Sequence, residues 1–145
     1  MSLLTQLNRL EARHRELLSL ARMTLSLAQR DDLAALEDTF NRRRLLSQEV
    51  EAQFRKLAPL WPRWDQELAA LPPDQAGQAQ DLVNRIAALG HEIVALDRQA
   101  ADRLTELKDQ TAQGLGRAKQ GKKLLNAYRS LPKPGSGLGQ VSKSG

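Results

Sequence analysis

The chain contains no cysteine, few aromatic residues and few β-branched residues, and each of these shortages excludes a class of protein. The lack of cysteine excludes a disulfide scaffold, a zinc–thiolate site and a cysteine nucleophile. Aromatic residues make up 3% of the 145 residues, and Val, Ile and Thr are scarce, whereas a sheet favours those types. The apolar residues, 41% of the chain, are mostly Leu and Ala, which favour helices. The composition therefore predicts an all-α protein.

Long apolar runs are also missing. No window approaches the roughly 20 apolar residues that a membrane-spanning helix needs. Polar residues interrupt the leucines of residues 1–15, where a signal peptide would have a continuous apolar core. The absence of cysteine is compatible with a reducing compartment. We therefore expect a cytoplasmic protein without stable membrane insertion.

Charge is distributed unevenly along the chain, whose formal net charge is +5. Residues 110–145 carry seven bases and no acid, which leaves 15 of the 22 bases against all 17 acids elsewhere. Such a basic segment is typical of proteins that bind nucleic acid or an acidic partner. It contains one aromatic residue, Tyr128, and no interleaved stacking residues, so nucleic acid is not favoured as the partner.

Apolar residues recur with alternating steps of four and three in three segments, which is the spacing of helix–helix contacts. The first segment runs from about Ser2, a plausible N-cap, to about Arg30. The second is predicted from about Leu33 to about Leu57, and either Asp31 or Asp32 would cap it.

Three consecutive arginines, Arg42 to Arg44, interrupt the apolar face of the second segment. Arginine stems cover apolar surface while their heads reach water, so we expect these guanidinium groups to be solvated. Prolines punctuate the stretch that follows. The segment Leu60–Trp64 is predicted to be a turn that buries at least one indole, with a short helix over residues 63–70.

A long third helix is predicted to begin near Asp74, with seam residues at the same spacing. Gly114 and Gly116 are expected to act as a kink or hinge, since a glycine within a helix costs about 1 kcal/mol relative to Ala. A fourth helical piece follows at about residues 116–131. The predicted architecture is an elongated antiparallel bundle of three to four helices over residues 1–131, with a coiled-coil-like third helix. Residues 132–145 are predicted to be a disordered Pro/Gly/Ser/Lys tail.

The motifs that would indicate catalysis fail in their details. Residues 116–123 match a phosphate-binding loop, but Lys123 stands where Ser or Thr would bind magnesium, and no β-strand precedes the motif. His91 begins a zinc-protease motif whose second histidine is replaced by Ala95. His14 falls on a helix seam, where a core or boundary residue is expected. We therefore predict a non-enzymatic protein with no catalytic, cofactor-binding or metal-binding residues and no small-molecule substrate.

The fourth helical piece is the best candidate interaction surface. Its apolar face either packs into the bundle core or, if the helix detaches, binds a partner, and the sequence leaves both alternatives open. Gly114 and Gly116 would permit the detachment. The candidate partner-binding residues are the apolar residues of this piece: Leu115, Ala118, Leu124, Leu125 and Tyr128.

Two parts of the chain resemble flagellar export chaperones of the FliT and FlgN type. Residues 27–36, Leu-Ala-Gln-Arg-Asp-Asp-Leu-Ala-Ala-Leu, lead into residues 41–46, Asn-Arg-Arg-Arg-Leu-Leu, and this succession is similar to the central pattern of those proteins. Leu33 stands where they usually have Trp, and Thr39 where another Leu is often found. Residues 121–128, Gly-Lys-Lys-Leu-Leu-Asn-Ala-Tyr, are similar to the last helix of FliT-type members, which favours that type.

The resemblance spans about residues 1–130 and implies a cytoplasmic chaperone that binds a late flagellar export substrate and delivers it to the export apparatus. FliT-type members escort the filament cap protein, and FlgN-type members escort the hook–filament junction proteins. The alternative function is a coiled-coil adaptor or a nucleic-acid-associated helical protein that uses the basic C-terminal segment. Both interpretations allow a homodimer.

Overall fold

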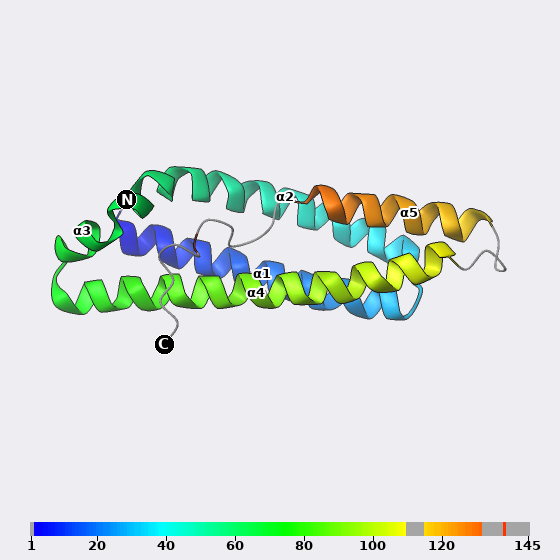
Figure 1. Ribbon diagram of the computed structural model, residues 1–145, viewed down its shortest axis with the longest axis horizontal. Coiled ribbons are helices and arrows are strands. Elements are labelled where there is room, and N and C mark those ends of the chain that lie inside the picture. The colour runs from blue at the N-terminus through cyan, green and yellow to red at the C-terminus, as the bar shows by residue number, and fades with distance from the viewer. Residues whose placement is uncertain (1, 110–114, 132–137, 139–145) are drawn as a thin grey trace.

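A computed structural model describes residues 2–109, 115–131 and 138, and for residues 115–118 the backbone alone. Within these ranges all regular structure is helical, which confirms the all-α prediction. In chain order the elements are α1 (Leu3–Gln29), α2 (Leu33–Leu57), the 3₁₀ helix η1 (Ala58–Arg63), α3 (Trp64–Ala69), α4 (Pro73–Asp109) and α5 (Leu115–Ser130). Figure 1 shows an elongated bundle in which α1, α2 and α4 run its length, whereas α5 folds back along one half.

Short polar side chains fix the boundary between α1 and α2 and the start of α1. The Ser2 hydroxyl and the Asp32 carboxylate each accept a hydrogen bond of 3.2 Å from the amide three residues on, so Ser2 and Asp32 are the N-caps. Asp31 instead has a φ of 57°, a left-handed conformation that Asp tolerates better than most residues. Its carboxylate accepts a hydrogen bond of 2.8 Å from Arg103 of α4, which fastens the α1–α2 turn to α4.

The opposite end of the bundle is closed by η1 and α3 (Figure 1). Trp61 and Trp64 are both buried there, with ring centroids 5.6 Å apart in an edge-to-face arrangement. The Trp64 indole N–H donates to the side-chain oxygen of Gln80 on α4 at 2.8 Å, which satisfies the buried donor. The predictions of a buried indole and of a short helix after it are confirmed.

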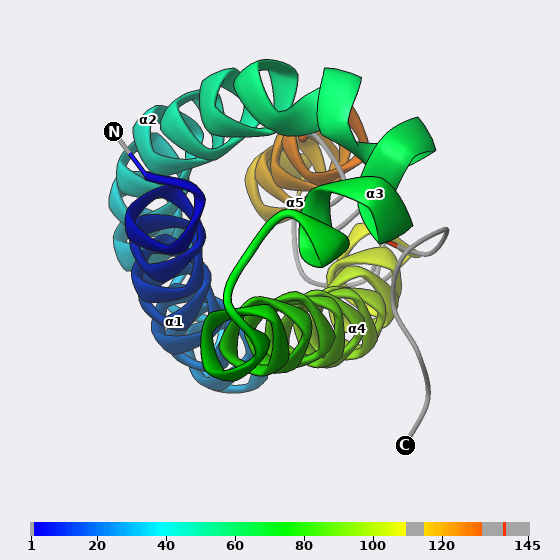
Figure 2. The same cartoon turned by 90° about the vertical axis from the view of Figure 1, so that its left-hand side faces the viewer.

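Buried side chains form two clusters along the bundle. The first cluster lies in the half that α3 closes, which we call the capped half, and includes Leu10, Leu17, Leu57, Ile86 and Ile93. The second cluster lies where α1 ends and α2 begins, in what we call the α5 half, and includes Leu36, Phe40, Leu104, Leu107, Leu124, Leu125 and Tyr128. Figure 2, which looks along the bundle, shows α5 behind α3 and between α2 and α4. The bundle thus has a fourth long helix in one half only.

His14 of α1 is buried in the capped half, as its seam position predicted. Its Nδ1 lies 2.9 Å from the Leu10 carbonyl oxygen, and its ring meets Phe54 of α2 edge-on at 5.6 Å. Burial lowers the pKa of His14, and the hydrogen bond to Leu10 opposes that shift in part. The ring is therefore held in its neutral form more strongly than a solvated histidine.

The structure describes only part of the C-terminal region. The fourth helical piece begins at Leu115, one residue before the predicted start. Residues 110–114 lie outside the described part of the chain, and with them the predicted hinge at Gly114. The predicted tail over residues 132–145 also lies outside it, with the exception of Leu138, which is fully buried and belongs to the first cluster. The expectation of disorder therefore does not extend to this leucine, which has apolar surface to bury.

Candidate functional site

The apolar face of α5 packs against the bundle. Leu124, Leu125 and Tyr128 are 3%, 3% and 8% exposed, and they belong to the same cluster as Leu104 and Leu107 of α4. The sequence left open whether this face packs into the bundle core or detaches to bind a partner. In the structure it packs into the core. Three of the five predicted partner-binding side chains come together on one buried face.

The other predicted site residues are described only in part. Leu115 and Ala118 lie in α5, but their side chains are outside the described part of the structure. Gly116, which was predicted to belong to a hinge, is the second residue of α5 and so stands at the start of this helix.

Gly121 sets how closely α5 approaches α4. A Cβ at this position would lie 3.5 Å from both the Leu104 carbonyl oxygen and the Lys108 amide nitrogen, and 3.8 Å from the Leu107 Cβ. These are van der Waals distances, so the two backbones pass with room for about one methyl group. Gly121 was the second glycine of the motif that resembles a phosphate-binding loop, and here it lies within a helix and serves packing.

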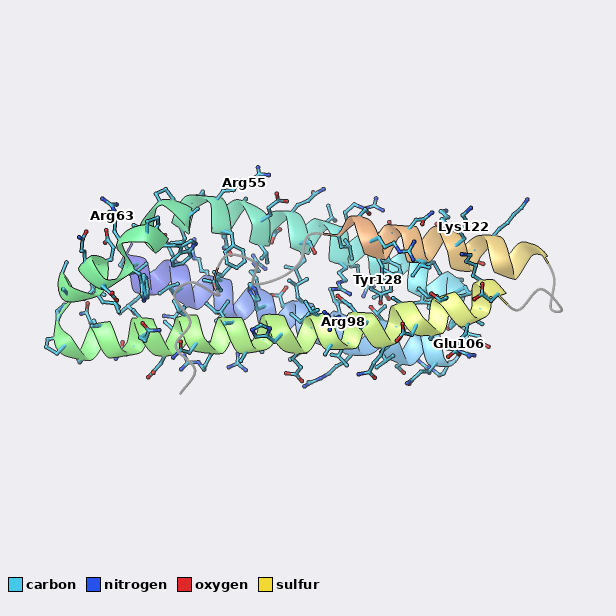
Figure 3. The ribbon with its side chains drawn as sticks, viewed as in Figure 1. Arg55, Arg63, Arg98, Glu106, Lys122 and Tyr128 are labelled. Atoms are coloured by element: carbon cyan, nitrogen blue, oxygen red, sulfur yellow. The ribbon has the colours of Figure 1, made fainter. Side chains whose placement is uncertain are left out.

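Tyr128 places an aromatic ring where α5 crosses α2. The ring meets Phe40 edge-on with centroids 4.4 Å apart, and the Arg43 guanidinium carbon lies 5.7 Å from its centroid, within cation–π range. Its hydroxyl is buried and lies near Thr24 and Arg43. Burial raises the pKa of Tyr128, the Asp97 carboxylate raises it further, and the nearby Arg43 and Thr24 oppose the rise. Figure 3 shows Tyr128 between α5 and α4.

A buried ion pair lies next to this ring. The two terminal nitrogens of Arg43 on α2 donate to the two carboxylate oxygens of Asp97 on α4, at 2.6 and 2.5 Å. The Arg43 side chain is 2% exposed and that of Asp97 is 21% exposed, and the Arg43 Nε has no partner among the described residues. We call the group formed by Thr24, Arg43, Asp97 and Tyr128 the polar joint, because it draws one side chain from each of α1, α2, α4 and α5.

The polar joint corrects the sequence analysis, which expected the head of Arg43 to be solvated. Arg42 and Arg44 are exposed as expected, but Arg43 faces the core. A signal was present, because Arg43 lies three residues after Phe40 and seven before Val50, on the buried stripe. Asp97 likewise lies four residues after Ile93 and three before Ala100. Opposite charges on the seams of two helices indicate a buried pair.

The outer face of α5 is basic. Lys119, Lys122 and Arg129 are exposed, and Figure 3 shows Lys122 on the side of α5 that points away from the bundle. Lys123 reaches across to Glu37 of α2 at 3.0 Å, with both side chains well exposed. Exposed ion pairs of this kind contribute little to stability. Burial of its apolar face therefore stabilises the docked α5 most.

Two further features limit the chemistry of the described residues. No three of their His, Cys, Asp or Glu side chains are grouped so as to hold a metal ion. No helix among them has the length and apolar character needed to cross a membrane.

These features define a helical bundle whose last helix covers apolar side chains that a partner helix could also cover. The family model of flagellar protein FliT matches residues 4–130. The chain therefore belongs to the FliT family, as the resemblance of its sequence predicted. The comparisons with curated proteins and with solved structures found no match to the chain.

Proposed function

We propose that the protein is an export chaperone that binds a late flagellar export substrate in the cytoplasm and delivers it to the export apparatus. Membership of the FliT family supports a flagellar role. The similarity of residues 121–128 to the last helix of FliT-type members supports the filament cap protein as the substrate. The function requires binding and release and no catalytic step.

The observation that carries the proposal is that α5 covers the α5 half with a face that a partner could replace. Burial of each large α5 side chain, Leu124, Leu125 and Tyr128, contributes about 1.5–3 kcal/mol. If α5 leaves, Phe40 and Leu104 lose their cover. An amphipathic helix of the substrate has the residue spacing needed to cover them again.

A substrate helix that buries side chains of similar size gains a comparable free energy. The exchange between α5 and the substrate is therefore close to balance.

Truncation after Gln113 tests the role of α5. We expect a folded core whose affinity for purified filament cap protein, measured by calorimetry, differs from that of the full chain. The affinity rises if α5 mainly occludes the site and falls if α5 mainly supplies contacts. Leu124→Asp and Tyr128→Ala should shift it in the same direction as the truncation, whereas Lys143→Ala, outside α5, should have little effect.

A matched pair at Gly121 gives a finer test with the full chain. Gly121→Ala fits the available space and favours the helix, so it should hold α5 in place. Gly121→Leu exceeds that space and should push α5 away from α4. The two variants should change the affinity for cap protein in opposite directions.

The outcomes separate the two parts of the proposal. Equal affinity in the truncated, Gly121→Ala and Gly121→Leu proteins would rule out a role of α5 in binding. A full chain that binds neither the cap protein nor a junction protein would rule out the chaperone function. Binding of a junction protein alone would leave a chaperone of different specificity.

The exposed bases of α5 support a second candidate, a coiled-coil adaptor or nucleic-acid-associated protein that keeps α5 docked. Lys119, Lys122 and Arg129 would then form the contact surface. Affinity for nucleic acid would fall steeply as salt rises. Substitution of the three bases by Gln would abolish such binding and would leave a contact through the apolar face of α5 nearly intact.

A further inference from the structure

The seam between α1 and α2 keeps one antiparallel register over most of its length. Arg13 of α1 lies 3.4 Å from Glu49 of α2, and the Thr39 hydroxyl of α2 donates to the Met23 sulfur of α1 at 3.8 Å. Met23 follows Arg13 by ten residues and Thr39 precedes Glu49 by ten, so the register is the same at both points. Because α5 lies between α2 and α4 (Figure 2), this seam is on the other side of α2 from α5.

Two hollows lie on this seam, one on each side of the contact between Arg13 and Glu49. The first hollow, of about 160 Å³, is lined by Gln6, Arg9, Gln53, Lys56 and Leu57. The second hollow, of about 350 Å³, is lined by Glu16, Ser19, Leu20, Arg42 and Leu46. About eleven residues of α1 separate the two hollows, which corresponds to about 16 Å along the helix axis. We call the seam with its two hollows the α1–α2 groove.

The groove carries bases that the described residues leave unpaired. Arg9 and Lys56 at the first hollow and Arg42 at the second are exposed, and no carboxylate of the described residues forms an ion pair with them. The two carboxylates of the groove both lie against Arg13, at 3.3 and 3.4 Å. The side-chain oxygen of Gln53 is buried at the first hollow and accepts no hydrogen bond from the described residues. The first hollow therefore offers two free charges and one free acceptor.

The seam between α1 and α4 differs, because its charges are paired across the two helices. Arg85 of α4 lies 2.6 Å from Glu11 of α1, and Arg22 of α1 lies 3.0 Å from Glu92 of α4. Helix α1 thus has one seam that is closed by ion pairs and one seam with an excess of positive charge. An acidic occupant complements the second seam.

Exposed apolar side chains gather at the second hollow. Among the described residues, the large apolar side chains that remain exposed are Met23 and Leu45, at 43% and 66%. Met23 follows Leu20 of the second hollow by three residues, and Leu45 follows Arg42 by three, so each is a neighbour of a lining residue on the same helix face. The second hollow therefore offers apolar surface, whereas the first offers charge.

We propose that the α1–α2 groove binds an acidic amphipathic helix of a partner protein other than the export substrate. Eleven residues of a helix make about three turns, so residues i and i+11 point to the same side. A carboxylate at the first of these positions meets Arg9 and Lys56, and a large apolar side chain at the second meets Met23 and Leu45. The occupant is not the C-terminal part of this chain, since residues 110–145 contain no acid.

The proposal goes beyond the proposed function and does not depend on it. The export substrate is assigned to the surface that α5 covers, whereas the α1–α2 groove lies on the other side of α2. The two partners can therefore bind at the same time.

A synthetic peptide tests the groove with the full chain. A fluorescent helical peptide of Ala and Gln carries two Glu one turn apart and then two Leu one turn apart, all on one face. The first Glu and the last Leu are about eleven residues apart. We expect saturable binding at low salt, measured by fluorescence anisotropy. The same peptide with Gln in place of both Glu should bind about tenfold more weakly.

Matched variants of the chain locate the binding site. Arg9→Glu with Lys56→Glu should weaken peptide binding by about tenfold or more, because like charges then face each other. The control is Arg98→Glu with Lys108→Glu, which reverses two exposed bases of α4, changes the net charge equally and should bind as the wild type does. Ser19→Leu should fill the second hollow and also weaken binding. All these positions are exposed, so circular dichroism should show an unchanged fold.

Several outcomes would overturn the proposal. Equal weakening by the two charge-reversed variants would mean that the peptide responds to net charge alone, and full binding to Ser19→Leu would place it outside the groove. A wild-type chain that dimerises in sedimentation, with a monomeric Arg9→Glu, Lys56→Glu variant, would make a second copy the occupant. A single-stranded oligonucleotide that binds where the peptide does not, and is lost in that variant, would make nucleic acid the occupant.

The filament cap protein separates this inference from the proposed function. The variant Arg9→Glu with Lys56→Glu should bind cap protein with the affinity of the wild type. A loss of about tenfold would make the groove part of the substrate site and contradict the inference. If the peptide binds as expected but no chain binds cap or junction protein, the chaperone function fails and the groove stands.

Discussion

The two halves of the bundle are closed in different ways. In the capped half, η1 and α3 follow α2 directly and carry two buried indoles over the end of the first cluster. In the α5 half, the closing helix α5 begins at Leu115 and is anchored through the second cluster. Helices α1, α2 and α4 run through both halves, so the halves differ in the elements that cover these three helices.

The two halves also differ in their buried polar groups. The capped half has His14, a neutral ring with a backbone partner in its own helix. The α5 half has an ion pair between α2 and α4, and the Tyr128 ring of α5 lies beside it. His14 is bonded within its own helix, whereas the Arg43–Asp97 pair joins α2 to α4 without α5 and therefore stays formed when Tyr128 withdraws. A cover held in this way is a removable one.

Asp97→Ala should produce the largest effect, because it leaves the Arg43 charge buried and unpaired. We expect a loss of about 3–5 kcal/mol in the free energy of unfolding, measured by urea denaturation. Both tryptophans lie in the capped half and the single tyrosine in the α5 half. The near-ultraviolet dichroism of Tyr128 should therefore disappear at lower urea than the tryptophan fluorescence changes.

The double variant Arg43→Met with Asp97→Leu is the control. It replaces the pair by apolar side chains and should recover most or all of the lost stability. If it were as unstable as Asp97→Ala alone, the penalty would come from lost packing and not from the unpaired charge.

The ion pair between Arg43 and Asp97 was not predicted from the sequence, whereas the bounds of the first helices were. Ser2, Asp32 and the regular spacing of leucines gave the bounds of the first two helices because caps and seams are local features. Arg43 and Asp97 are 54 residues apart, and each alone is compatible with a solvated head. Leu138 was missed because the composition around it indicates disorder, whereas its burial depends on packing against the first cluster, which lies far away in the sequence.

Acidification should weaken the capped half through His14. Its pKa is lowered in the folded state, so below about pH 6.5 the unfolded chain takes up a proton that the folded chain resists. Stability should fall with pH in that range, by up to about 1.4 kcal/mol per pH unit for one proton. His14→Gln should flatten the pH dependence, measured by tryptophan fluorescence in urea.

The matched control is His91→Gln, since His91 is exposed on α4. This substitution should leave the pH dependence unchanged. Equal flattening by both variants would show that the effect does not arise from burial.

Gly121→Ala should stabilise the α5 half by about 1 kcal/mol, since alanine favours the helix and its methyl group fits. The Tyr128 signal should then persist to higher urea, while the tryptophan transition moves less. A shift of both transitions by the same amount would mean that α5 unfolds together with the capped half.

Lys123→Ala should have the smallest effect. It removes the exposed contact with Glu37, and such pairs contribute about 0.2–1 kcal/mol. The Tyr128 transition should shift slightly at low salt and hardly at all in 0.5 M NaCl, where screening is strong. A larger shift that persists at high salt would mean that the edge of α5 contributes more to docking than its buried face.

Native-state hydrogen exchange tests most directly whether α5 is a removable cover. Helices that open on their own exchange their amides at a lower free energy than the global core. We predict that the amides of residues 121–129 exchange through such an opening, while the amides around Leu10 and Ile86 in the capped half require global unfolding. If both sets exchange with the same free energy and the same dependence on denaturant, α5 is a fixed part of one cooperative bundle, and the account is contradicted.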